Sequence, residues 1–217
     1  MRAVVIAGGP VFTQSLRRMC EGAEVVVCAD SGADNAKKAG IIPHKFYGDM
    51  DSISDEARAW IDSLGIVPEV FPVEKDMTDS ELALRSIPDE YEILFVCSLR
   101  GRPDHVIANE LLAARLRREG RSIEVTDGST RIIYLKGPQT YEYTMDDEDE
   151  VVSIIPFEVE SEGVKGVSVS GFHYPLNNAD LESGSSLTVS NKGETLGTPL
   201  RISVNSGVAG VFRSKEE

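Results

Sequence analysis

The sequence is poor in basic residues and in cysteine. Lysine and arginine together number 22 against 36 aspartates and glutamates, which leaves a formal net charge of −14 at pH 7. Because such a charge repels a phosphate backbone, we expect no nucleic acid among the partners of this protein. Cys20, Cys28 and Cys97 cannot all pair with one another, and two of them lie in apolar runs, so we expect reduced thiols in a core.

Long apolar segments are also missing. No run approaches the roughly 18 residues that a membrane-spanning helix needs. The apolar residues 3–7 are followed at once by Gly8, Gly9 and Pro10, which makes them too short for the core of a signal peptide. We therefore expect a soluble, cytoplasmic protein without a membrane partner. With 217 residues, of which 41% are hydrophobic, the chain can bury the core of one large or two small domains.

Several common catalytic motifs are absent as well. The chain has no G-x-x-x-x-G-K-[ST], which excludes a Walker-type phosphate loop, and no G-x-S-x-G, the motif of many serine hydrolases. The three histidines are scattered, and no two cysteines have C-x-x-C spacing. We therefore expect no zinc site.

Up to about residue 135, short apolar runs alternate with segments of helical period, which is typical of a parallel sheet covered by helices. The runs are residues 3–7, 25–29, 67–71, 92–97 and 123–126. Thr78 begins an S/T-x-x-E capping box, which predicts a helix from that point. A longer helix is predicted over residues 104–119, with one apolar face made of Ala108, Leu111, Leu112 and Leu116.

After residue 135 the helical period disappears. Short alternating runs follow, separated by turn-forming residues such as 136–138 (KGP) and 177–178 (NN). The sequence thus predicts an α/β domain over residues 1–135, followed by an antiparallel β-sandwich over residues 136–217. The acidic residues 146–150 stand between two predicted strands, where a solvated loop is favoured over a metal site.

Polar residues follow four predicted strands of the first domain. In an open α/β sheet, ligands bind outside the carboxyl ends of the strands. The clusters are residues 30–32 (DSG), 48–52 (GDMDS), 75–79 (KDMTD) and 101–105 (GRPDH). Each alone could be a helix cap or a turn. Several carboxylates at one sheet edge, however, repel one another unless cations neutralise them.

A divalent metal ion would supply that neutralisation. Asp49 and Asp51, two positions apart, can both face one point, as oxygen ligands of Mg²⁺ do beside substrate phosphates. Arg102 offers a planar fork suited to phosphate, and Gly101 lets the backbone come close. His105 could contact a nucleotide or simply hydrogen-bond near a helix cap. Together these residues predict an Mg²⁺-dependent site for phosphoryl or pyrophosphoryl transfer.

The order and spacing of these motifs resemble the thiamine pyrophosphokinase family. In the first domain the resemblance is carried by residues 28–34 (CADSGAD), 48–53 (GDMDSI), 75–79 (KDMTD) and 101–105 (GRPDH) with Asn109. In the second domain it is carried by residues 171–176 (GFHYPL), 184–187 (GSSL) and 189–191 (VSN). The resemblance covers nearly the whole chain.

The resemblance implies a reaction and an assembly. The β,γ-pyrophosphate of ATP would pass to the primary hydroxyl of thiamine, which gives thiamine diphosphate and AMP. The family uses Mg²⁺, and it works as a homodimer in which the β domain of one subunit completes the thiamine pocket of the other.

The same resemblance implies roles for individual residues. Asp49, Asp51 and Asp79 would bind metal, with Asp30 supporting the same cluster, and the three would act in catalysis together with Arg102 and Asp104. The residues implied to contact ATP are Asp30, Lys75, Asp76, Thr78, Gly101, Arg102, His105 and Asn109. The residues implied to contact thiamine are Ser185, Ser190 and Asn191.

Three other functions stay open at this point. A pyrophosphokinase of the same fold could act on another small alcohol such as a pterin, although Ser190 and Asn191 favour thiamine. A phosphatase could use Asp49 as the nucleophile of a D-x-D pattern, but residues 44–47 (HKFY) are a poor match to the apolar strand that this pattern prefers. A ligand-binding sensor that retains the fold would not need all of the acidic positions.

Overall fold

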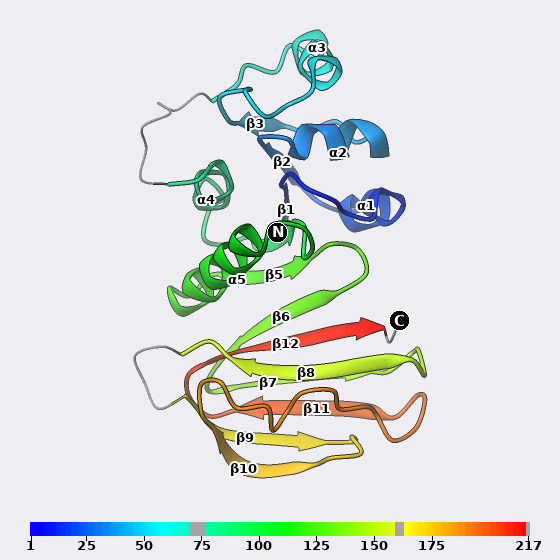
Figure 1. Cartoon of the computed structure of the whole chain (residues 1–217), viewed down its shortest axis with the longest axis vertical. Helices are drawn as coiled ribbons and strands as arrows, with labels where there is room; N and C mark the ends of the chain where they lie inside the picture. The colour runs from blue at the N-terminus through cyan, green and yellow to red at the C-terminus, as the bar shows by residue number, and fades with distance from the viewer. Residues whose placement is uncertain (70–76, 159–162, 216–217) are drawn as a thin grey trace. The chain divides into compact units, whose positions relative to one another are not determined.

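The structure is a computed structural model, and it describes residues 1–69, 77–158 and 163–215 (Figure 1). The chain divides into two compact units. One consists of Met1–Leu112 with Arg121–Gly128, and the other of Ala113–Gly120 with Ser129–Glu217. The predicted architecture, an α/β part followed by an antiparallel β part, is confirmed. None of the described helices is long and apolar enough to cross a membrane.

The first unit contains a parallel sheet with the strand order β3-β2-β1-β4-β5. Its strands are β1 (Arg2–Ile6), β2 (Val25–Ala29), β3 (Lys45–Tyr47), β4 (Glu92–Val96) and β5 (Ser122–Thr126). Because β1 has β2 on one side and β4 on the other, the strand order reverses there, and such a reversal opens a crevice for ligands at the carboxyl ends. Residues 70 and 71 of the strand expected over residues 67–71 lie outside the described residues, and within the described part Glu69 makes a parallel bridge to Tyr47.

Two helices of this part of the chain begin after a residue whose side chain caps them. The helices here are α1 (Thr13–Cys20), α2 (Gly32–Ala39), α3 (Asp55–Ser63), α4 (Asp79–Arg85) and α5 (Pro103–Arg118). The hydroxyl of Ser54 accepts a hydrogen bond from the Ala57 amide at 3.1 Å and caps α3. The hydroxyl of Thr78 accepts one from the Glu81 amide at 3.2 Å and caps α4. Proline is well suited to the first position of α5, since it has no amide hydrogen to satisfy.

The face that α5 buries differs in part from the predicted one, because Leu116 is buried as expected but Ala108 is exposed. The buried residues of this helix are Ala113, Ala114 and Leu116, whereas Leu111 is 47% exposed. Apolar residues occur on more than one side of this helix, so the helical period alone did not identify the packed side.

Gly32 brings the start of α2 against the end of β1. A Cβ atom at this position would come closer than 3.0 Å to the carbonyl oxygen of Ile6. Only glycine allows this approach. The turn from β2 into α2, which carries Asp30, is therefore held against the carboxyl edge of the sheet.

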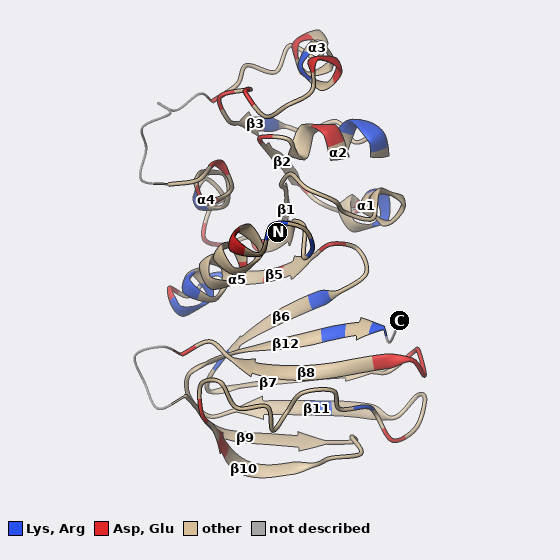
Figure 2. Cartoon of the chain, viewed as in Figure 1, with Lys and Arg blue, Asp and Glu red and all other residues tan. Residues whose placement is uncertain are grey.

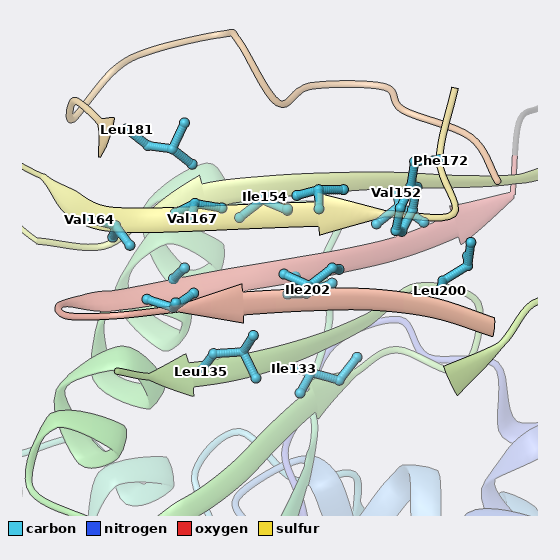
Figure 3. Packing of buried hydrophobic residues seen from close by; sticks show 14 of the residues in the cluster. Ile133, Leu135, Val152, Ile154, Val164, Val167, Phe172, Leu181, Leu200 and Ile202 are labelled. Carbon is cyan, nitrogen blue, oxygen red and sulfur yellow. The ribbon is translucent and has the colours of Figure 1, made fainter. Parts of the chain in front are cut away.

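The second unit consists of antiparallel strands. One set has the order β6-β12-β8 and the other β10-β9-β11-β7. Their bounds are β6 (Arg131–Lys136), β7 (Gln139–Thr144), β8 (Glu150–Pro156), β9 (Val164–Ser170), β10 (Leu176–Leu181), β11 (Pro199–Val204) and β12 (Val208–Lys215). Alternate side chains of these strands, including Ile154, Val167 and Ile202, gather in one apolar core (Figure 3).

The acidic segment 146–150 is not wholly solvated, contrary to expectation. Glu150 is buried, and its carboxylate pairs with the Arg213 guanidinium at 2.7 Å. The Tyr143 hydroxyl donates a hydrogen bond of 2.6 Å to the same carboxylate, and burial together with this bond raises the pKa of Tyr143. Glu150 is thus part of a buried polar network, which the run of acidic residues did not indicate.

Candidate active site

Asp30 stands at the carboxyl end of β2 in an unusual backbone conformation. Its φ is 48°, in the left-handed region that residues other than glycine rarely adopt. The conformation is held from both sides, because the Asp30 amide donates to the Tyr47 carbonyl at 2.8 Å and the Asp30 carbonyl accepts from the Ala33 amide at 3.1 Å. These bonds orient the Asp30 carboxyl at the sheet edge.

Asp49 and Asp51 follow β3, the strand next to β2. Gly48 has a φ of 144°, and a Cβ atom there would lie 3.3 Å from the Cα of Asp30, so the two turns touch through glycine. The Asp51 amide donates to the Asp49 carboxylate at 3.2 Å across Met50, whose φ is 65°. Figure 2 shows acidic residues in red in the loop after β3.

Carboxylate oxygens of Asp30, Asp49 and Asp51 all lie within 4.8 Å of one another. Burial raises the pKa of the Asp30 carboxyl, and the negative charges of Asp79, Asp51 and Asp49 raise it further. One Asp30 oxygen is buried and has no hydrogen-bond partner among the described residues. A buried, unsatisfied oxygen within a group of like charges is unfavourable unless a cation joins it. The all-oxygen donor set therefore fits a hard divalent metal ion.

The structure brings Asp30, Asp49 and Asp51 together, whereas the sequence placed Asp79 with the last two. Asp79 begins α4 and is close enough to act on the pKa of Asp30. The group of three that could share one ion does not include it. Asp30 was expected among the ATP contacts and, from the family resemblance, as a support of the carboxylate cluster, and the structure places it in the group itself.

The structure describes only part of the segment around Thr78. The Thr78 hydroxyl caps α4, so its contact with ATP stays a prediction. Lys75 and Asp76, two further expected ATP contacts, lie outside the described residues.

Arg102 and Asp104 form an ion pair at the start of α5. The guanidinium donates to both carboxylate oxygens, at 2.6 and 3.2 Å, and the two side chains are 71% and 63% exposed. The hydrogen bond between them raises the pKa of Arg102 and lowers that of Asp104. Both groups are thus charged and face solvent. Gly101, with a φ of 93°, makes the turn that leads into them.

His105 and Asn109 follow on α5 with different surroundings. His105 is exposed, whereas Asn109 is half-buried and its side chain hydrogen-bonds to Cys97 at the end of β4. Burial raises the pKa of the Cys97 thiol. The prediction of reduced thiols in a core is confirmed for Cys28 and Cys97, which are free and buried.

The residues expected to contact thiamine lie in the second unit. Asn191 is buried, and its side-chain amide exchanges two hydrogen bonds with the Tyr174 backbone, accepting from the amide at 3.2 Å and donating to the carbonyl at 2.9 Å. Ser190 is exposed, with a φ of 62°, and its amide donates to the Ser153 hydroxyl at 3.0 Å. The Ser185 hydroxyl accepts from the Leu187 amide at 3.3 Å.

Tyr174 lies in the motif 171–176, but the sequence predicted no contact for it. Its side chain is 72% exposed although Asn191 fixes its backbone. An exposed aromatic ring on a backbone held by hydrogen bonds can form part of a binding surface. The sequence could not show this exposure, because it depends on the folded chain.

Both parts of the chain match models of known protein families. Residues 16–125 match the model of the thiamin pyrophosphokinase catalytic domain, and residues 140–209 match that of the thiamin pyrophosphokinase vitamin B1 binding domain. Thiamine pyrophosphokinase of Bacillus subtilis (strain 168) is 32% identical over 193 residues, which are 87% of each chain. The chain belongs to the thiamine pyrophosphokinase family. It is accordingly an enzyme, a thiamine diphosphokinase.

Solved structures show how far the family fold extends. The crystal structure of thiamine pyrophosphokinase from B. subtilis matches with a TM-score of 0.83 at 28% identity, over 100% of both chains. Thiamin pyrophosphokinase from Candida albicans matches with a TM-score of 0.81 at 14% identity, over 99% of this chain and 90% of that one. At so low an identity the second match shows the fold alone, and the fold is shared along the whole chain.

Proposed function

We propose that this thiamine pyrophosphokinase transfers the β,γ-pyrophosphoryl group of ATP to the primary hydroxyl of thiamine, using Mg²⁺, and releases thiamine diphosphate and AMP. The observation that carries the proposal is the group of three carboxylates at the ends of β2 and β3. Such a group tolerates the negative charge of ATP only when cations accompany it. Membership of the family supports thiamine as the acceptor.

The roles of the acidic residues follow from their placement. Asp30, Asp49 and Asp51 would hold Mg²⁺, and Asp79 adds negative charge beside them. Mg²⁺ bound in this way neutralises phosphate charge and stabilises the charge that builds up during transfer. The strained turns at Asp30 and Met50 fix the carboxylates before the substrate arrives, so little reorganisation is needed during the reaction.

Arg102 would bind the phosphates. In the structure it pairs with Asp104, and because both side chains are exposed this pair contributes little to stability. The guanidinium can therefore leave Asp104 for a phosphate group at a small cost in free energy. Its planar fork matches the arrangement of two phosphate oxygens. His105 and Asn109 would add contacts to the nucleotide from the same helix.

The reaction is tested by its products. The purified protein, incubated with ATP, Mg²⁺ and thiamine, should form AMP and thiamine diphosphate in equal amounts, as measured by chromatography. A hydroxymethyl pterin in place of thiamine should give no AMP. Formation of ADP with thiamine monophosphate, or release of phosphate without thiamine, would contradict the proposal.

The assembly and compartment form part of the same proposal. The carboxylate group and the Ser190 and Asn191 region belong to different compact units of the chain. We infer a cytoplasmic homodimer in which the second unit of one subunit completes the thiamine site beside the carboxylates of the other. A two-fold axis would then create two equivalent sites.

We further infer that the Tyr174 ring lies against the positively charged ring of thiamine. Aromatic faces attract cations, and the interaction is worth about 0.5 to 2 kcal/mol. Tyr174→Ala should raise the KM for thiamine by about tenfold, which corresponds to ~1.4 kcal/mol, and leave the KM for ATP unchanged. Steady-state kinetics measures both values.

Two further variants make the Tyr174 test specific. Tyr174→Phe keeps the ring and should stay close to the parent enzyme. Leu196→Ala removes another exposed apolar side chain of the same unit and serves as the control. An unchanged thiamine KM in a folded Tyr174→Ala protein would rule out the contact.

A further inference from the structure

The loops after β1, β4 and β5 leave the carboxyl edge of the first unit's sheet from neighbouring strands. The loop after β4 leads through Gly101 to Arg102, the residue assigned to the phosphates. Arg102 is exposed and pairs with Asp104 in the first turn of α5, so this pair does not fasten the loop to the sheet. The position of Arg102 therefore depends on other contacts of its loop.

A buried carboxylate stands at the end of β5. The Asp127 side chain is 2% exposed, and the Nε atom of Arg100 lies 3.6 Å from one of its oxygens. A carboxylate that is removed from water is unfavourable unless cations or hydrogen-bond donors accompany it. The buried charge of Asp127 thus favours the conformation in which Arg100 turns toward β5.

Two further contacts hold Arg100. Its guanidinium lies 4.9 Å from the centre of the Phe12 ring, and aromatic faces attract cations at such distances. The Ser98 hydroxyl accepts a hydrogen bond from the Arg100 amide at 3.1 Å and donates one to the Arg100 carbonyl at 2.6 Å. Both the side chain and the backbone of Arg100 are therefore fixed, two positions before Arg102.

The loop after β1 is joined to the same group. The Phe12 amide donates to the backbone carbonyl of Asp127 at 2.7 Å. A Cβ atom at Gly9 would come within 2.8 Å of the Cβ of Ser98, so the loops after β1 and β4 also touch there. Asp127 thus contacts one loop through its carbonyl and the other through its carboxylate.

We propose that Asp127 is a positioning residue for the reaction. Its carboxylate holds Arg100, and Arg100 fixes the loop that presents Arg102 to the phosphates. The inference rests on the proposed function, which gives Arg102 a task that requires an exact position. A shift of about 1 Å in a group that contacts the reacting atoms can lower the rate by about a hundredfold.

Asp127→Asn tests the side chain alone, because asparagine keeps the size of the residue and the backbone carbonyl that holds Phe12. It should lower kcat/KM for ATP by about tenfold and leave the KM for thiamine close to the parent value. Arg100→Ala should lower kcat/KM for ATP to a similar extent. Arg100→Lys keeps a cation near the carboxylate and should recover part of the loss.

A carboxylate and an arginine at the opposite edge of the same sheet provide the control. Asp89 precedes β4 and pairs with Arg121, which precedes β5, at 3.3 Å. Asp89→Asn removes one charge from this pair far from the carboxyl ends of the strands. It should leave kcat/KM for ATP and the KM for thiamine unchanged.

A double variant separates positioning from a general structural effect. If Asp127 acts through Arg102, Asp127→Asn should lower the rate little further once Arg102 is already alanine, so the two losses should not add. Additive losses would overturn the inference. Parent-like kinetics in Asp127→Asn and Arg100→Ala proteins would overturn it as well, with circular dichroism to show that each variant is folded.

Hydrogen exchange provides a readout that needs no substrate. The backbone amides of residues 99–102 should exchange faster, by about threefold or more, in Asp127→Asn and Arg100→Ala, but not in Asp89→Asn. Unchanged exchange in the first two variants would overturn the inference even where activity falls. If the parent makes no AMP, the proposed function fails, and the exchange rates still decide whether Asp127 holds the loop.

Discussion

Asp51→Asn should lower the turnover of thiamine with ATP and Mg²⁺ by about a hundredfold or more. This is the scale of losing one electrostatic contact that is made in the transition state. Asp51 is exposed and its carboxylate packs into no core, so the change removes a negative charge from the metal group without disturbing the fold. Asp79→Asn should lower turnover to a similar extent, because the negative charge of Asp79 acts on Asp30 and contributes to the same site. Initial rates at saturating substrate measure both.

The same Asp51→Asn variant should be at least as stable as the parent when no divalent metal is present. The carboxylates of Asp30, Asp49 and Asp51 repel one another in the empty group, and the amide removes one of the charges. Urea denaturation in the presence of a chelator measures this. Asp62→Asn on α3 is the matched control, since it removes an exposed charge from the same unit and should change neither rate nor stability. Near-normal turnover in folded Asp51→Asn and Asp79→Asn proteins would show that the metal assignment is wrong.

Arg102→Ala should also reduce kcat/KM for ATP by about a hundredfold, while the midpoint of thermal unfolding stays the same. The loss is expected because the guanidinium would bind phosphate by two hydrogen bonds. The unchanged stability is expected because the exposed pair with Asp104 contributes little. Arg102→Lys keeps the charge but not the planar fork, so it should recover only part of the activity.

A second arginine on the same helix provides the control for Arg102. Arg115 forms a comparable exposed pair with Glu119, at 3.1 Å and with side-chain exposures of 59% and 41%. Arg115→Ala removes the same charge from α5 farther from the sheet edge and should leave activity unchanged. Equal losses in the two variants would indicate that the total charge of the helix, and not the position of Arg102, determines the effect.

Much of this protein could be predicted from its sequence because the relevant signals are local. Apolar runs predicted β1, β2, β4 and β5, and the Thr78 capping box and the helical period predicted α4 and α5, whereas α1 and α2 were not predicted. Polar residues directly after strands predicted the edge at which the site lies, since all parallel strands end on the same side. The combined motifs also indicated the family, which the comparisons confirm.

Other features depended on which elements pack together. The helical period did not identify the buried side of α5, where Ala113 and Ala114 are buried and Leu111 is not. The run of acidic residues did not reveal that Glu150 is buried against Arg213, because its partner is 63 positions away. The pattern of apolar and charged residues predicts whether a segment is a helix, a strand or a loop. Burial depends instead on the segment that packs against it, which can be distant in the sequence.

The sequence by itself determined which chemical groups stand at the sheet edge, because a residue that follows a parallel strand must lie there. The family resemblance implied that Asp30 supports the carboxylate cluster. Only the tertiary structure brings its oxygen within 4.8 Å of those of Asp49 and Asp51, since this requires β2 and β3 to be neighbours and Gly48 to touch the backbone of Asp30. The close packing of α2 against the end of β1 depends in the same way on Gly32, where a Cβ atom would meet the Ile6 carbonyl. Strand order and close contact arise from packing between segments far apart in the chain, and no local pattern encodes them.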